Sequence, residues 1–279
     1  MRFAFKTSQQ HTNWEDLLAV WREADDIEIF ESGWNFDHFY PIFSDPTGPC
    51  LEGWITLTAL AQATRRLRMG TLVTGIHYRH PAVLANMAST LDIISGGRLE
   101  LGIGAGWNEQ ESGAYGLELG SARDRSDRFE EACEVLVGLM SKETTTFEGK
   151  FYQLTEARNE PKGPQRPHPP ICIGGNGEKR TLRTTARFAQ HWNYLGGPVE
   201  EFIRKRDVLH AHCADIGRDP AQITLSSHIR LGENGEFGPA VEQIAALAEA
   251  GLDLAIVYLP TPHTPSILTP LAEALAPLA

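Results

Sequence analysis

The sequence predicts a (β/α)8 barrel, and three observations support this fold class. Short apolar runs typical of buried strands alternate with helical patterns along the whole chain. Polar or glycine-rich residues follow several of these runs, at the strand ends where barrel enzymes keep their reacting groups. The chain of 279 residues is slightly longer than a typical barrel of about 250 residues, which leaves room for one insertion. A doubly wound open sheet is the alternative architecture.

Eight strand patterns and eight helix patterns follow one another in order. In the helix over 81–94, Pro81 suits the first turn, apolar residues recur at helical spacing, and Ser95, Gly96 and Gly97 end the pattern. The expected strands are 2–6, 27–32, 68–73, 99–103, 170–173, 192–195, 223–227 and 252–258. The expected helices are 13–24, 51–64, 81–94, 122–140, 178–189, 199–216, 239–250 and 264–278. Each strand is thus followed by one helix, as the barrel requires.

An insertion over residues 141–169 separates the fourth helix from the fifth strand. It contains two hairpin-like segments, 144–147 and 151–154, and ends in a proline-rich stretch. Loops of this length in a compact domain usually have a function of their own or are mobile. We expect the insertion above or beside the carboxyl ends of the strands, where it could act as a lid, within a single domain over 1–279.

Composition restricts the class of protein. A hydrophobic content of 42% and 22% charged residues are typical of a globular chain in water, and no apolar stretch approaches the roughly 20 residues of a membrane span. The four cysteines form no CxxC pair and the first residues do not resemble a signal peptide, so we expect a cytoplasmic protein. The net charge of −11 disfavours nucleic acid and anionic membranes as partners.

Asp37 and His38 follow the second strand pattern and are candidate reacting groups. Histidine has the side-chain pKa nearest neutral pH, so His38 is a candidate general acid or base at a barrel strand end. The alternative is a structural histidine held by a loop carbonyl, because the chain has 10 histidines and most cannot be catalytic.

Two glycine-rich strand ends are candidate ligand sites. The end formed by Gly104, Ala105, Gly106, Trp107 and Asn108 would let a flat ligand approach the backbone closely. The turn formed by Gly174, Gly175, Asn176 and Gly177 precedes a basic helix, and free N–H groups at a helix start favour an anion such as phosphate. Cations could come from Arg79, His80, Lys179, Arg180 and Arg183. The alternative for the second turn is tight packing, since the sequence is not a nucleotide P-loop.

Four motifs in order resemble one known family. They are DHF at 37–39, GTLVTGIHYRHP at 70–81, GRLELGIGAGWNEQE at 97–111 and PPICIGGNGEKR at 169–180. Together they resemble the bacterial luciferase-like superfamily, particularly its coenzyme F420-dependent branch. The resemblance spans nearly the whole chain. It implies a (β/α)8 barrel, often dimeric, that binds a flavin or deazaflavin at the carboxyl ends of its strands and transfers a hydride.

The resemblance also assigns roles to single residues. His38 corresponds to the active-site histidine beside the deazaflavin ring, and Asp37 is its companion in the motif. The segment of Leu72, Val73 and Thr74 corresponds to a bulge whose non-proline cis peptide supports the back of the ring. The residues along the cofactor correspond to Gly104, Ala105, Gly106, Trp107 and Asn108. The phosphate cradle corresponds to Gly174, Gly175, Asn176 and Gly177.

The implied function is transfer of a hydride between coenzyme F420 and a small organic substrate by a homodimer, with His38 as acid or base. Some relatives use a glutamate near the position of Trp107 for a sugar phosphate, and this chain offers only Glu109 and Glu111 nearby, so that substrate is not implied. The alternatives are an FMN-dependent monooxygenase of the same superfamily and a flavin-binding protein without turnover. A metal-dependent hydrolase is disfavoured because the first strand has no HxH motif, and we expect no metal site.

Overall fold

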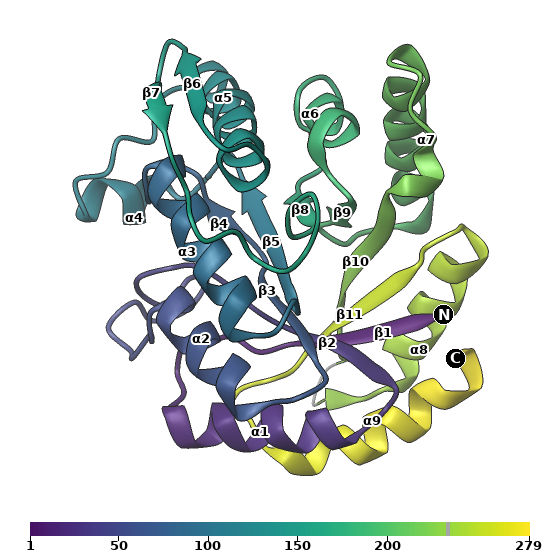
Figure 1. Ribbon diagram of the computed structural model, residues 1–279. Coiled ribbons are helices and arrows are strands. Elements are labelled where there is room, and N and C mark those ends of the chain that lie inside the picture. The colour runs from purple at the N-terminus through teal and green to yellow at the C-terminus, as the bar shows by residue number, and fades with distance from the viewer. Residues whose placement is uncertain (233–234) are drawn as a thin grey trace.

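Strand pairing closes a parallel sheet into a barrel. The structure is a computed structural model and describes residues 1–232 and 235–279. Within these ranges the sheet order is β3-β2-β1-β11-β10-β9-β8-β5-β4, and pairing of β3 with β5 completes the circle (Figure 1). The barrel strands are β1 (Arg2–Lys6), β2 (Phe30–Asn35), β3 (Arg68–Thr71), β4 (Thr74–Gly75), β5 (Leu99–Gly104), β8 (Ile171–Gly174), β9 (His191–Tyr194), β10 (Thr224–Arg230) and β11 (Leu254–Tyr258). The predicted (β/α)8 barrel is confirmed.

Helices surround these strands (Figure 1). They are α1 (Trp14–Asp26), α2 (Gly53–Ala63), α3 (Pro81–Ile94), α4 (Glu109–Ala114), α5 (Ala122–Ser141), α6 (Thr181–Phe188), α7 (Val199–Asp215), α8 (Gly238–Glu249) and α9 (Leu268–Leu275). Across the described ranges, no helix combines the length and apolarity that a bilayer crossing needs.

Most predicted bounds lie within a few residues of the observed ones, and the second strand shows why some differ. The prediction began at residue 27, whereas β2 begins at Phe30. Ile27 instead caps α1, with its N–H bonded to the Ala24 carbonyl. The Arg66 guanidinium binds the carbonyls of Ile27 and Phe30 and so fixes this turn. The strand consequently ends at Asn35, two residues before Asp37.

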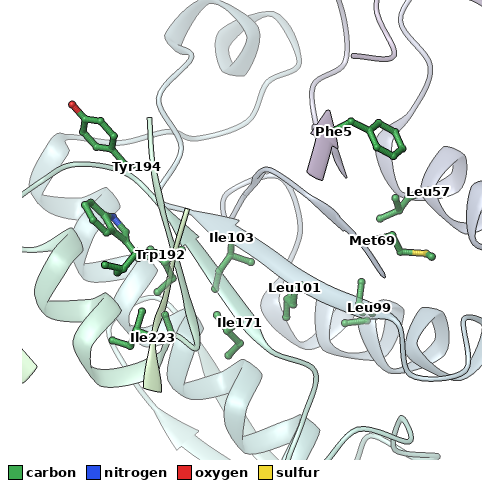
Figure 2. Close-up of a cluster of buried hydrophobic side chains, with 14 of the residues drawn as sticks. Phe5, Leu57, Met69, Leu99, Leu101, Ile103, Ile171, Trp192, Tyr194 and Ile223 are labelled. Carbon is green, nitrogen blue, oxygen red and sulfur yellow. The ribbon is translucent and has the colours of Figure 1, made fainter. Parts of the chain in front are cut away.

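Two hydrophobic clusters lie on opposite sides of the barrel wall. The larger one fills the space between strands and helices, and Figure 2 shows part of it with Leu99, Leu101 and Ile103 of β5. The smaller cluster consists of Ala4, Trp34, Leu72, Cys172, Leu254 and Ile256, with Val73 packed against it. These residues come from four different barrel strands and the β3–β4 connection, so they fill the interior of the cylinder.

A bulge interrupts the third barrel position between β3 and β4. Leu72 and Val73 lie between the two short strands, and the peptide bond that joins them is cis. The hydroxyls of Thr71 and Thr74 lie 2.9 Å apart, and the Trp54 indole N–H donates to the Thr74 hydroxyl at 2.9 Å. The bulge expected over Leu72, Val73 and Thr74 is therefore present.

The insertion forms an antiparallel hairpin of β6 (Thr145–Glu148) and β7 (Gln153–Ala157) beside α5 (Figure 1). Beyond the hairpin, the Asn159 amide donates to Ser89 Oγ at 2.9 Å, and the Gln165 amide donates to Asp92 Oδ1 at 2.7 Å. Ser89 and Asp92 belong to α3. These contacts fasten the insertion to the helices on the outside of the barrel.

Candidate functional site

The predicted site segments all lie at one end of the barrel. His38 follows β2, Val73 follows β3, Trp107 follows β5 and Gly175 follows β8. These strands run parallel to one another around the closed sheet. Their carboxyl ends therefore open on the same mouth, and His38 and the glycine turn share that end of the molecule.

A buried hydrogen-bond network fixes the His38 ring. His38 Nδ1 lies 2.7 Å from Glu111 Oε2, and the Phe39 amide donates to Glu111 Oε1 at 2.6 Å. The Tyr78 hydroxyl donates to Glu111 Oε2 at 2.5 Å. The Glu111 side chain is fully buried and His38 is 7% exposed. The loops after β2, β4 and β5 therefore meet at one carboxylate.

The electrostatics of this network keep Glu111 charged. Burial alone would raise the pKa of Glu111, but hydrogen bonds from His38, Tyr78 and the Phe39 amide outweigh burial and lower it. Burial and the bond to Glu111 raise the pKa of Tyr78, so the phenol stays protonated. The carboxylate on Nδ1 fixes the orientation of the imidazole. His38 Nε2 is then the ring atom available for proton exchange.

Glu111 and Tyr78 were not predicted as site residues. Asn108 caps α4 by accepting the Glu111 amide N–H on its side chain at 3.1 Å, which places Glu111 at the third helical position. A glutamate at that position after an N-cap is typical of a capping box, so its pattern indicates helix initiation rather than a site. Here its carboxylate reaches His38 instead of the cap.

Asp37 has a different partner from the one its motif suggests. Its fully buried carboxylate forms a bidentate pair with the Arg79 guanidinium, with 3.1 Å between Nη2 and Oδ1. Arg79 Nη2 also bonds to Glu52 Oε1 at 2.6 Å. Burial raises the pKa of Asp37, against the effect of Arg79. Arg79 is thus already paired with two carboxylates, although its charge was expected to serve an anionic ligand.

Exposed aromatic side chains form the rim near His38. The Trp107 ring lies edge-on to the His38 ring at 5.8 Å between centroids and stacks on Phe43 at 5.3 Å. Trp107 is 51% exposed and Phe43 is 84% exposed. Contiguous apolar surface that is exposed to solvent often marks a ligand-binding or partner-binding site. The predicted role of Trp107 at the ligand site stays a prediction.

Glycines leave the ends of β5 and β8 bare. An added Cβ at Gly104 would lie 2.8 Å from Val73 Cγ2, and one at Gly174 would lie 3.1 Å from Val73 Cγ1. An added Cβ at Gly102 would come within 1.7 Å of the Thr71 carbonyl oxygen. The bulge can therefore enter the barrel only because β5 and β8 end in glycine. Backbone and Val73, without long side chains, form a surface that fits a flat ring.

The glycine turn after β8 has some of its polar groups engaged already. Gly175 has φ +134, and its amide donates to the Asn193 carbonyl at 3.2 Å. The Asn176 side chain accepts from the Leu195 amide at 3.2 Å. Of the expected nearby cations, Arg180 pairs with Asp127 and Arg183 with Glu130. Phosphate binding at this turn stays a prediction, and any phosphate there would use the amides beyond Gly175.

The sequence matches the model of the luciferase-like monooxygenase family over residues 1–236. The chain belongs to that family. A relative in Microbacterium testaceum, an F420-dependent glucose-6-phosphate dehydrogenase, is 31% identical over 247 residues, which are 87% of this chain and 71% of that one. An F420-dependent hydroxymycolic acid dehydrogenase of Mycobacterium tuberculosis is 31% identical over 238 residues, covering 84% of this chain and 62% of that one. The resemblance to the F420-dependent branch is confirmed.

A solved structure shares the fold of this luciferase-like protein. The structure of an F420-dependent secondary alcohol dehydrogenase with an F420-acetone adduct superposes with a TM-score of 0.87 over 100% of this chain and 99% of that chain. The identity of 19% makes this a likeness of fold.

Proposed function

We propose that this luciferase-like barrel is an F420-dependent oxidoreductase that interconverts a small alcohol and its carbonyl form. The observation that carries the proposal is the His38–Glu111 pair, a proton-exchanging ring fixed by a buried carboxylate beside a bare glycine-lined surface. The relatives named as F420-dependent dehydrogenases support the same cofactor and reaction class. We extend the proposal to a homodimer with one barrel domain in each chain.

Each residue of the mouth has a separate role in the proposed reaction. Coenzyme F420 supplies the hydride chemistry when it is bound, and Val73 with the Gly104 and Gly174 backbone would hold its ring. His38 Nε2 would donate a proton to a carbonyl oxygen in reduction and remove it from the hydroxyl in oxidation. Glu111 holds the ring by its bond to Nδ1 and keeps Nδ1 from turning toward the ligand. Trp107 and Phe43 stack on each other at the rim and would contact a bound ligand from that side.

Substitution of His38 tests the proposal. His38→Ala should lower turnover by about 10²-fold or more, the usual contribution of a general acid or base, and change F420 affinity only a few-fold. Coenzyme affinity is measured by quenching of tryptophan fluorescence, with FMN titrated in parallel. Turnover is measured from coenzyme absorbance with a panel of alcohols.

His210→Ala, on the outer helix α7, is the matched control and should leave turnover and affinity unchanged. An equal loss of F420 binding and turnover in His38→Ala would make His38 a residue that only positions the coenzyme. Tight binding of FMN with none of F420 would refute the coenzyme assignment.

A further inference from the structure

Three nitrogen-bearing side chains gather on the wall of the mouth that faces the glycine ends. Lys6 is the last residue of β1, and His228 and Arg230 lie near the end of β10. Both strands neighbour β11, which lies half-way around the closed strand order from β5. In register, Lys6 and Arg230 flank Tyr258 of β11 on either side. We name Lys6, His228 and Arg230 the cationic group.

Lys6 is buried with most of its hydrogen-bonding capacity unused. It has the same strand parity as Ala4, which lies in the interior cluster, so its side chain points into the barrel. Its Nζ donates to the Leu72 carbonyl at 3.0 Å and lies 5.5 Å and 5.3 Å from the ring centres of Phe36 and Tyr258. The side chain is 5% exposed. An ammonium has three donors, and a single acceptor satisfies one of them.

His228 and Arg230 add polar capacity beside it. His228 Nε2 is covered and has no hydrogen-bond partner within the described ranges. Arg230 is on β10 and Lys6 is on β1, the two strands on either side of β11. The Arg230 guanidinium lies 5.5 Å from the Tyr258 ring centre, and the residue is exposed. A ligand entering from solvent would therefore meet Arg230 first, then His228 and Lys6 at greater depth.

The three groups repel one another. Burial, followed by the charge of Arg230, lowers the pKa of Lys6 to about 7. Burial, followed by the charges of Lys6 and Arg230, lowers the pKa of His228. Among the residues that the structure describes, no carboxylate contributes to either pKa. A buried cation without a partner is costly, so a negatively charged oxygen placed here would be strongly favoured.

We propose that Lys6, His228 and Arg230 form an oxyanion-binding subsite, so that the substrate of this enzyme carries a carboxylate or phosphate group. This inference rests on the proposed oxidoreductase function. The subsite begins at the bulge, where Lys6 Nζ bonds to the Leu72 carbonyl next to Val73, and extends past Tyr258 to Arg230 on β10, where it could hold the anionic end of a substrate. The net charge of −11 does not oppose it, because binding depends on the local cations.

Small oxyanions test the subsite without knowledge of the substrate. Acetate and inorganic phosphate are titrated into the F420-loaded and coenzyme-free protein, and binding is followed by calorimetry and by the NMR signal of the His228 ring. We expect at least one probe to bind and to raise the pKa of His228. Lys6→Met should weaken that binding at least tenfold, about 1.4 kcal/mol. The stronger probe identifies the carboxylate or phosphate class.

Two variants keep the test decisive. Lys142→Met, at the exposed end of α5, is the matched control and should bind the probe as the wild type does. Arg230→Gln removes an exposed charge and should also weaken binding, even if Lys6→Met fails to fold. Equal probe affinity in wild type and Arg230→Gln, or no binding of either probe, overturns the subsite. Failure of F420 to bind refutes the proposed function separately, because the coenzyme-free titration still reports on the subsite.

Discussion

The two ends of the barrel interior both contain buried charge, but they compensate it differently. At the amino-terminal end, Arg68 pairs with Glu100 at 2.9 Å and His191 Nδ1 pairs with the other oxygen of Glu100 at 3.0 Å. At the carboxyl end, no carboxylate of residues 1–232 or 235–279 contributes to the pKa of Lys6 or His228. In barrels the amino-terminal face serves stability and the carboxyl face serves catalysis. The carboxyl end also contains the paired residues Asp37–Arg79 and His38–Glu111, so the feature that distinguishes it is the group of Lys6 and His228.

The paired end is a self-contained network. A cavity of about 260 Å³ opens there, lined by Arg68, Glu100 and His191 among others. Burial opposes ionisation of Glu100, but bonds from His191 and Arg68 lower its pKa to about 2. His191 Nε2 also lies 2.6 Å from Ser226 Oγ. Because these side chains satisfy one another, the cavity offers a ligand little that the protein does not already provide.

The largest effect should follow from breaking the paired end. Glu100→Ala would leave Arg68 and His191 without their carboxylate, and losing one partner of a buried ion pair costs about 3–5 kcal/mol of unfolding free energy. Urea denaturation measures that loss, and F420 affinity of the folded fraction should not change. Asp26→Asn, in an exposed pair with Arg65, is the control and should cost about 0–1 kcal/mol. Similar losses in the two variants would contradict the distinction between the ends.

The pH dependence of stability should be smaller and should also come from the paired end. Burial would lower the pKa of His191, but the Cys172 and Glu100 side chains raise it to about 10. A raised pKa gives stability that is complete below the unfolded value of about 6.5 and is lost as pH rises toward 10. The lowered pKa of Glu100 gives stability that is lost as pH falls from about 4.5 toward 2.

Replacement of His191 measures this contribution. His191→Gln should flatten the decline of stability between pH 7 and 10 by at most about 1.4 kcal/mol for each pH unit. The control is His210→Gln. Burial lowers the pKa of His210, so raising the pH from 7 to 10 removes no stabilising charge from this residue. An unchanged alkaline decline in His191→Gln would show that other groups cause it.

The smallest effect should come from the bare wall of the open end. Gly104→Ala would press a methyl group against Val73 at 2.8 Å and shift the expected back of the ring site. F420 affinity of the folded protein should fall roughly threefold to tenfold, up to about 1.4 kcal/mol. Gly113→Ala in α4 meets open space and should leave affinity unchanged. Equal F420 affinities in the two variants would show that Val73 does not contact the coenzyme.

Sequence patterns could predict the barrel and the position of its site because both depend on local signals. Strand and helix periodicity placed the elements, and parallel topology brought His38, Val73 and the glycine ends to one mouth. The same signals could not place Glu111, because its position in a helix start has an ordinary capping explanation. Its bond to His38 joins residues 73 positions apart.

Pairing of charges was also beyond local patterns. Arg79 and Arg180 looked available for an anionic ligand, but each is paired with a carboxylate from another loop or helix. Lys6 was unremarkable as the last residue of a strand, since only the closed sheet shows that it points into the interior. Compensation of charge depends on contacts between distant segments, so it requires the folded structure.

The arrangement of two adjacent residue pairs has a stereochemical consequence. Tyr78 and Arg79 are consecutive, and they hold the consecutive residues His38 and Asp37, the first through Glu111 and the second directly. Rotation of the His38 imidazole would break the contacts of Nδ1 with Glu111 and with the Tyr78 hydroxyl. The proton would therefore reach a ligand from one direction, which gives the carbonyl oxygen of a substrate one place in the mouth and leaves the choice of face for the hydride to the binding of the two substituents.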